Sequence, residues 1–401
     1  MNTKEIKVQR NIIIGRYLSG RVGSDIFVTD TLGLSDYFSV ISSKMIICRK
    51  WLSVSHIAII CRTLGITVVQ ISDTDVRFQD GLYVTYDIIR KTIYISDNKI
   101  EINKYNRQSI NNYSDQSLLY SVKYQLGIIN SIPHIRSITD SISGNVEQLF
   151  LRSELLWLPL RDNPYAYLGR NGTRATSKTL FNQLQPICNI LEKKHLILHF
   201  RGLDLRSDED FNMGHSLKSE PNPVLGLHGL RQLLQHKDYL LAELGAIKEL
   251  YASGFHNIIY SLPFVTSSNE VADFVQFSKQ HGCMPNVFGV YIETPASVID
   301  IERILDCGAS NIYVGTKDLA MLTLAVDRNN ESVAHLMDIM SIPVVSQIRH
   351  VIQSCDKRHL SSYVFSSMED IPSLVEMIPS LLGFSVPAAE YLAVLDTLEY
   401  E

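Results

Sequence analysis

Short apolar runs separated by polar breaks occupy the first 95 residues. We expect strands at residues 11–14, 26–28, 44–48, 67–71, 82–85 and 92–95. One segment with helical spacing, Ser55–Leu64, lies between two of these runs, and Gly65 follows it as the expected C-terminal cap. The pattern therefore predicts a small α/β domain over residues 1–96.

The rhythm changes after a polar segment. Residues 97–116 are rich in Asn, Ser, Lys and Tyr and predict a linker. Within residues 117–401, strand-like runs recur at 118–126, 146–151, 196–200, 257–265, 287–292, 311–314, 361–365 and 383–386. Helical patterns separate most of them, the clearest at 229–251, 268–281, 295–306 and 344–355. Eight strand–helix units predict a closed (β/α)8 TIM barrel rather than an open sheet.

Composition and charge narrow the class of protein. Hydrophobic residues make up 45% and charged residues 20% of the chain, which is ordinary for a globular protein. The net charge of −5 gives no field that would attract nucleic acid or an anionic membrane. We find no apolar run long enough to cross a bilayer and no secretion signal. We therefore expect a cytoplasmic protein that binds neither nucleic acid nor a membrane. The six cysteines form no C-x-x-C pair, which predicts reduced packing residues.

Charged residues follow several of the predicted strands. In a TIM barrel the functional side chains come from the C-terminal ends of the strands. Glu293 and Asp318 follow successive strands and are suited to bind Mg²⁺. Arg152, Arg201 and Arg328 come from similar positions, and guanidinium groups suit phosphate and carboxylate oxygens. Each charge alone would more often be an ion pair at the rim, but together they predict a site for a small phosphorylated acid.

These residues lie in motifs that resemble the PEP-binding barrel of the PEP-utilising enzymes, which include PEP synthase, pyruvate phosphate dikinase and enzyme I of the sugar phosphotransferase system. The likeness is carried by N-P-V-L-G-L-H-G-L-R, L-P-F-V, I-E-T-P and above all V-G-T-K-D-L followed by T-L-A-V-D-R, the last ending at Arg328. It implies that Arg152, Arg201 and Arg328 clamp PEP, pyruvate or a related small acid. It also implies that Glu293 and Asp318 bind Mg²⁺.

The N-terminal segment resembles the swivelling phosphohistidine domain of the same family. Ser55–Ile66 is similar to S-H-A-A-I-x-A-R-x-L-G-I, whose histidine carries the phosphoryl group, and this makes His56 the implied phosphoacceptor. Backbone N–H groups at a helix start could hold that group. Without the resemblance, a histidine on this apolar helix would more often be a packing residue. The family's glycines before the histidine are here Trp51 and Leu52.

The barrel motifs also depart from the family pattern. Lys317 replaces the asparagine of T-N-D, and His228 replaces the arginine of N-P-x-L-G-x-R. The cysteine that moves a proton at the methyl carbon of pyruvate aligns with Phe365, which transfers no proton. Lys317, His228 or Cys355 would have to replace it. We therefore count Lys317 as a candidate catalytic residue, with a pKa lowered by a buried neighbourhood of arginines, and His228 as a candidate substrate ligand.

The leading hypothesis is a phosphotransferase in which His56 moves a phosphoryl group between PEP or a partner protein and a Mg²⁺-bound acid, enol or alcohol. No ATP-grasp domain and no helical docking insert are recognisable, so a separate ATP-grasp or phosphocarrier protein is the expected partner. The sequence leaves open whether the chain forms a homodimer through its barrel. One alternative is a non-catalytic regulatory or binding protein, and another is a Mg²⁺-dependent lyase or hydrolase of 2-oxo acids.

Overall fold

The chain consists of two compact units, residues 1–113 and 114–401, in the computed structural model. The structure describes residues 12–16, 25–33, 36–50, 56–71, 78–79, 81–87, 92–97, 120–142, 144–209, 220–328, 330 and 332–398.

The N-terminal unit contains two three-stranded sheets. β2 (Ile26–Thr31), β3 (Met45–Lys50) and β4 (Thr67–Gln70) form a parallel sheet, and β1 (Ile12–Arg16), β5 (Tyr83–Asp87) and β6 (Thr92–Ser96) form an antiparallel one. Helices α1 (Tyr37–Ile41) and α2 (His56–Leu64) connect the parallel strands. Fully buried Ile26, Met45, Ile47 and Val84 come from both sheets, so the two sheets share one core.

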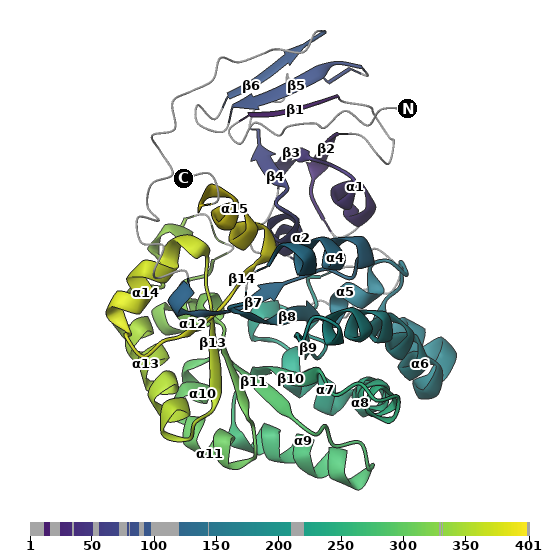
Figure 1. Ribbon diagram of the computed structural model, residues 1–401, viewed down its shortest axis with the longest axis vertical. Coiled ribbons are helices and arrows are strands. Elements are labelled where there is room, and N and C mark those ends of the chain that lie inside the picture. The colour runs from purple at the N-terminus through teal and green to yellow at the C-terminus, as the bar shows by residue number, and fades with distance from the viewer. Residues whose placement is uncertain are drawn as a thin grey trace. The chain divides into compact units, whose positions relative to one another are not determined.

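The second unit is a closed barrel of eight parallel strands (Figure 1). Its strands are β7 (Lys123–Gly127), β8 (Val146–Arg152), β9 (Ile197–Arg201), β10 (Ile258–Val265), β11 (Phe288–Ile292), β12 (Asn311–Val314), β13 (Ser361–Phe365) and β14 (Gly383–Pro387). The last strand pairs with the first, which closes the barrel. The predicted (β/α)8 barrel is thus confirmed, although the strand expected at 118–126 begins only at Lys123.

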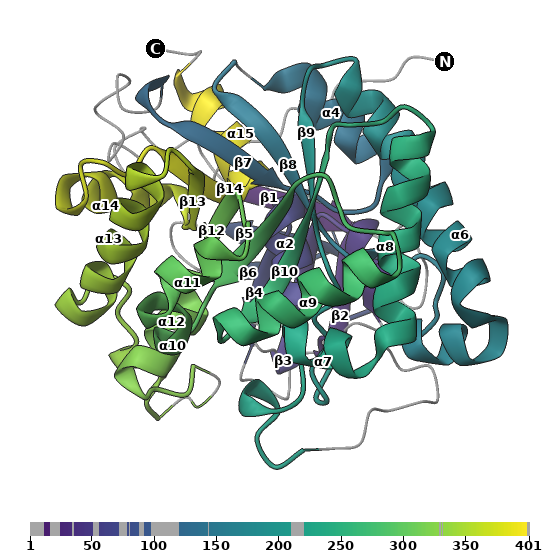
Figure 2. The same cartoon turned by 90° about the horizontal axis from the view of Figure 1, so that it is seen from below.

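Helices surround the barrel strands, as Figure 2 shows. They are α4 (Ile132–Ser141), α5 (Glu154–Trp157), α6 (Pro164–Glu192), α7 (Gly229–Gln235), α8 (Lys237–Ala252), α9 (Ser268–Gln280), α10 (Pro295–Ile299), α11 (Ile301–Asp306), α12 (Thr316–Leu324), α13 (Ile342–Lys357), α14 (Ile371–Met377) and α15 (Ala388–Leu398). The predictions of single helices over residues 229–251 and 295–306 are wrong, because the first breaks at His236 and the second at Asp300. The Asp300 carboxylate accepts a hydrogen bond from Ser268 N at 2.6 Å, which ties this break to the start of α9.

Side chains fill the barrel interior. The Gln125 amide nitrogen lies 2.8 Å from Gln148 Oε1 and 2.7 Å from His199 Nδ1, and Ser385 Oγ donates to Gln125 Oε1 at 2.8 Å. The His199 ring stacks on Tyr313 with 3.7 Å between ring centroids. These polar groups bind one another, which offsets the cost of burying them. The barrel is therefore a packed core that supports a site at its mouth.

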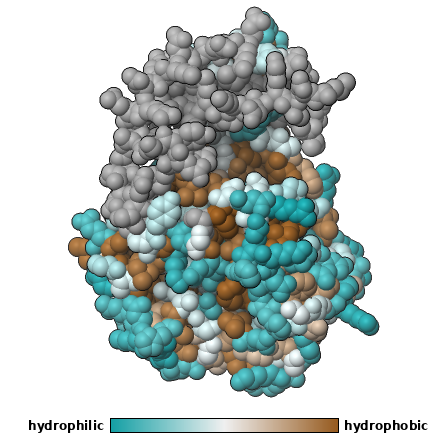
Figure 3. Space-filling model, viewed as in Figure 1, coloured by the Kyte–Doolittle hydropathy of each residue, from teal (hydrophilic) through white to brown (hydrophobic). Residues whose placement is uncertain are grey.

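The outer surface of the barrel is mixed in polarity. On the face shown in Figure 3, hydrophilic residues lie among hydrophobic areas. No helix in the described ranges has the length and hydropathy that a membrane crossing requires. The cytoplasmic location stays a prediction.

Candidate active site

Two arginines end neighbouring strands at the barrel mouth. Arg152 of β8 and Arg201 of β9 are partners in the strand register. Arg201 is almost fully buried and pairs with Glu154 Oε1 at 2.5 Å and with Asp204 Oδ2 at 3.3 Å, and its guanidinium lies 5.6 Å from the Tyr291 ring centroid. Burial alone would lower the pKa of Arg201, but the two carboxylates raise it above its ordinary value.

Arg152 differs from Arg201 in its ionic partners. No described carboxylate forms an ion pair with Arg152, and its guanidinium lies 5.1 Å from the Phe150 ring centroid. Burial, and then the charge of Arg201, lower the pKa of Arg152 below its ordinary value. Arginine keeps its charge in proteins in spite of such shifts. A bound anion that contacts both guanidinium groups would relieve their repulsion.

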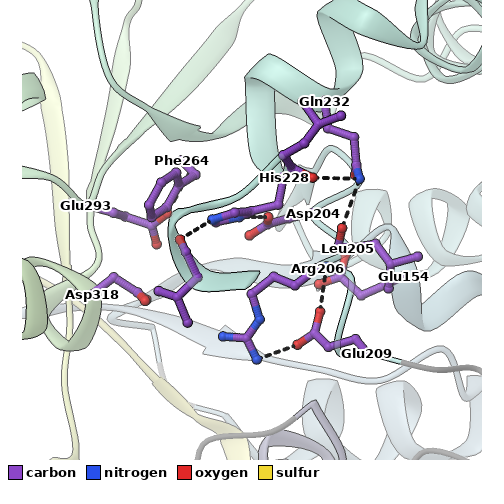
Figure 4. A network of polar contacts seen from close by, with 12 residues as sticks. Glu154, Asp204, Leu205, Arg206, Glu209, His228, Gln232, Phe264, Glu293 and Asp318 are labelled. Carbon is purple, nitrogen blue, oxygen red and sulfur yellow. Dashed lines mark hydrogen bonds and ion pairs between the residues drawn. The ribbon is translucent and has the colours of Figure 1, made fainter. Parts of the chain in front are cut away.

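Two carboxylates approach the same space from β11 and α12 (Figure 4). Glu293 directly follows β11 and is 5% exposed, and Asp318 lies in the first turn of α12. Glu293 Oε2 accepts a hydrogen bond from Phe264 N at 3.2 Å. Burial, and then the negative charge of Asp318, raise the pKa of Glu293 to about 8. A Cβ atom at Gly315 would lie 2.3 Å from Glu293 Oε1, so only glycine allows this close approach.

The two carboxylates fit a Mg²⁺ ion that takes further ligands from substrate and water. In the described part of the chain, no three His, Cys, Asp or Glu side chains gather as a metal cluster. Mg²⁺ commonly binds one or two protein carboxylates together with waters and substrate phosphates. Glu293 and Asp318 match that donor set, and a cation between them would relieve the repulsion that raises the pKa of Glu293.

His228 contacts acceptors through both ring nitrogens. Its Nδ1 lies 2.8 Å from Asp204 Oδ1 and its Nε2 lies 2.8 Å from Val224 O. Both partners only accept hydrogen bonds, so both ring nitrogens carry a proton. Burial opposes this charge, but Asp204 raises the pKa of His228 above its ordinary value. A cation thus occupies the position of the family's arginine, and its contact with substrate stays a prediction.

The remaining predicted site residues differ in placement. Arg328 pairs with Asp318 at 3.1 Å and so belongs to the site. The Lys317 side chain is exposed, so the prediction that it lies in a buried neighbourhood of arginines is wrong, because Thr316, Leu319 and Ala320 form the buried face of α12 instead. His56 is the first residue of α2, but its side chain lies outside the described structure, as do Trp51 and Leu52.

An aromatic residue stands at the end of β13 where the family pattern has its cysteine. The Phe365 ring lies 5.3 Å from Phe150 and 5.5 Å from Tyr291 between centroids. Cys355 is buried on α13, and burial raises the pKa of its thiol to about 12. A thiol of that kind stays protonated near neutral pH, so it makes a poor proton acceptor.

Sequence reasoning missed Arg206. This arginine pairs with Glu209 at 3.1 Å and Asp208 at 3.2 Å. Burial alone would lower its pKa, but these carboxylates raise it above its ordinary value. Figure 4 shows Arg206 among the other residues of the site. Its position five residues after Arg201, in the loop that follows β9, was the signal available in the sequence.

The barrel sequence is similar to that of known proteins. Residues 146–384 match the family model described as PEP-utilising enzyme, PEP-binding domain. A probable phosphoenolpyruvate synthase of Methanocaldococcus jannaschii is 28% identical over 329 residues, covering 80% of this chain and 27% of its own. The phosphoenolpyruvate synthase of Pyrococcus furiosus is 27% identical, covering 82% of this chain and 41% of its own.

A phosphoenolpyruvate-protein phosphotransferase of Buchnera aphidicola is similar as well. It is 27% identical over 311 residues, which are 74% of this chain and 53% of that protein. The chain thus spans between about a quarter and about half of the length of these relatives. The match to the family model covers more than half of the chain and includes both arginine-bearing strand ends and both carboxylates. The chain belongs to the PEP-utilising enzyme family.

Proposed function

We propose that this chain is a phosphotransferase whose barrel binds PEP or a related small acid and whose His56 carries the phosphoryl group. One observation carries the proposal. Arg152 and Arg201 end neighbouring strands at the same barrel mouth that holds the interacting carboxylates Glu293 and Asp318. Arg152 and Arg201 would hold the carboxylate and phosphoryl oxygens of the ligand. Mg²⁺ held by Glu293 and Asp318 would neutralise the negative charge of the phosphoryl group during its transfer.

In the transfer itself, a ring nitrogen of His56 would attack the phosphorus of PEP. The N–P bond forms as the P–O bond breaks, and the enolate of pyruvate leaves and takes its proton from solvent. The two-unit organisation supports this proposal, in which a domain over residues 1–96 moves on a linker over residues 97–116. A separate ATP-grasp or phosphocarrier protein is the proposed partner.

We propose that the acceptor is an ordinary hydroxyl group rather than pyruvate, because pyruvate must lose a proton from its methyl carbon before its enol oxygen can accept the phosphoryl group. Phe365 stands at the mouth beside Phe150 and Tyr291 and offers no proton. Cys355 is buried with a raised pKa, and Lys317 is exposed. Transfer to an ordinary hydroxyl group requires no proton transfer at carbon, and so it fits this set of side chains.

Incubation with radiolabelled PEP, and separately with labelled ATP plus an ATP-grasp protein, tests the proposal. Acid-labile label should appear on the wild-type chain and on His335→Ala, a matched control at an exposed barrel histidine, but not on His56→Ala. Label on His56→Ala equal to the wild type would contradict the role of the histidine. PEP binding without any label would favour the regulatory alternative, and consumption of a 2-oxo acid without label would favour the lyase or hydrolase.

A further inference from the structure

A buried carboxylate on α8 lies on the helix side of the arginine-bearing strands and is absent from the contacts described above. Glu243 is fully buried. Its Oε1 accepts hydrogen bonds from the Ser153 hydroxyl at 2.5 Å and from Leu203 N at 3.1 Å, and its Oε2 accepts from the Tyr260 hydroxyl at 2.6 Å. One helical side chain therefore connects residues of β10 with the segments that follow β8 and β9.

The residues that Glu243 binds sit within the two charged segments of the site. Ser153 lies between Arg152 and Glu154, and Leu203 lies between Arg201 and Asp204. Ser153 N also donates to Arg201 O at 3.0 Å. The positions of Ser153 and Leu203 thus set the spacing of the ion pairs that Arg201 makes with Glu154 and Asp204.

The surroundings of Glu243 are shaped to accept a carboxylate. Three hydrogen-bond donors point at its two oxygens, which offsets the cost of burying them. A Cβ atom at Gly202 would lie 2.5 Å from the Tyr260 hydroxyl oxygen, so glycine leaves room for that hydroxyl. The Tyr239 hydroxyl accepts from Trp157 Nε1 at 2.7 Å and lies 3.4 Å from Ser153 Oγ, which extends the network.

We propose that Glu243 is a positioning residue that holds the ends of β8 and β9 at the spacing at which Arg152 and Arg201 bind one anionic ligand together. This inference rests on the proposed function, because it concerns the same arginines. Glu243 itself contacts no ligand and acts through Ser153 and Leu203. Side chains that bind a ligand need such support, since displacement of a bound substrate by about 1 Å can cost about a hundredfold in rate.

Substitutions of Glu243 test the proposal through PEP affinity. Glu243→Leu removes every acceptor, whereas Glu243→Gln keeps one carbonyl oxygen. Glu249→Gln is the matched control, because Glu249 lies on the same helix and pairs at the surface with Lys178. With Mg²⁺ present, calorimetry should show that Glu243→Leu lowers the affinity for PEP about tenfold. Glu243→Gln should lower it less, and Glu249→Gln should leave it unchanged. Wild-type affinity in folded Glu243→Leu would overturn the proposal.

Two further measurements keep the outcome decisive. If circular dichroism shows that Glu243→Leu does not fold, Tyr260→Phe and Glu243→Gln take its place, and wild-type affinity in both would overturn the proposal. Hydrogen exchange of the Ser153 and Leu203 amides should be faster in the Glu243 variants than in the wild type without any ligand. If the wild type does not bind PEP, the proposed function fails. Faster amide exchange at Ser153 and Leu203 in the Glu243 variants would still support the positioning role of Glu243. Unchanged exchange would refute positioning by Glu243.

Discussion

Replacing Arg201 should separate the stability of the barrel from its ligand binding. The side chains of Arg201 and Glu154 are 4% and 1% exposed, and their ion pair measures 2.5 Å. Solvent screens a pair this buried only weakly, so removing one partner costs about 3–5 kcal/mol, because the remaining charge loses the ion that offsets its desolvation. We therefore expect Arg201→Met to lower the free energy of unfolding of the barrel by about 3–5 kcal/mol.

A double variant tests that reason. Arg201→Met combined with Glu154→Gln leaves no ionised carboxylate at position 154, so it should regain most of the lost free energy of unfolding while PEP binding stays lost. Urea titrations report the barrel through the fluorescence of fully buried Trp157, in a Trp51→Phe background that removes the other tryptophan. Calorimetry with PEP reports binding. Equal destabilisation by the single and double variants would refute the explanation by desolvation.

Three other predictions follow from the same contacts. Gly202→Ala should lower the free energy of unfolding by about 1–3 kcal/mol, because its Cβ atom would lie 2.5 Å from the Tyr260 hydroxyl oxygen; a urea titration with no change would contradict this. Burial raises the pKa of Glu243 to about 7 from 4.5, so the native state binds more protons between those values. Stability should fall as the pH rises through that range, and Glu243→Gln should flatten the thermal denaturation curve against pH. Glu293→Gln and Asp318→Asn should each weaken Mg²⁺ binding in the presence of PEP, and wild-type Mg²⁺ affinity should rise as the pH approaches about 8, because Glu293 binds the metal only after losing its proton. Calorimetry that shows wild-type Mg²⁺ affinity in both variants would exclude this metal site.

The barrel and the general location of the site were predictable from the sequence. Buried parallel strands are continuous apolar runs such as 287–292, and each is followed by a helical pattern, so their order along the chain indicates the fold. Because parallel strands all point the same way, charged residues that directly follow them must gather at one mouth. This places Arg152, Arg201, Glu293 and Asp318 together without knowledge of any contact. The resemblance to the family then predicts their roles.

Only the tertiary structure decided which groups pair and which side chains are buried. A sequence motif does not show that Glu154 takes Arg201 as its partner, or that Lys317 is exposed beside Asp318. Asp300, where the helix breaks, accepts a hydrogen bond from Ser268, which lies 32 residues earlier. Glu243 lies in the helical pattern of residues 229–251 and belongs to no motif that would mark it out. Its role depends on donors from three other elements, and hydrogen bonds between such distant residues form only when packing brings them together.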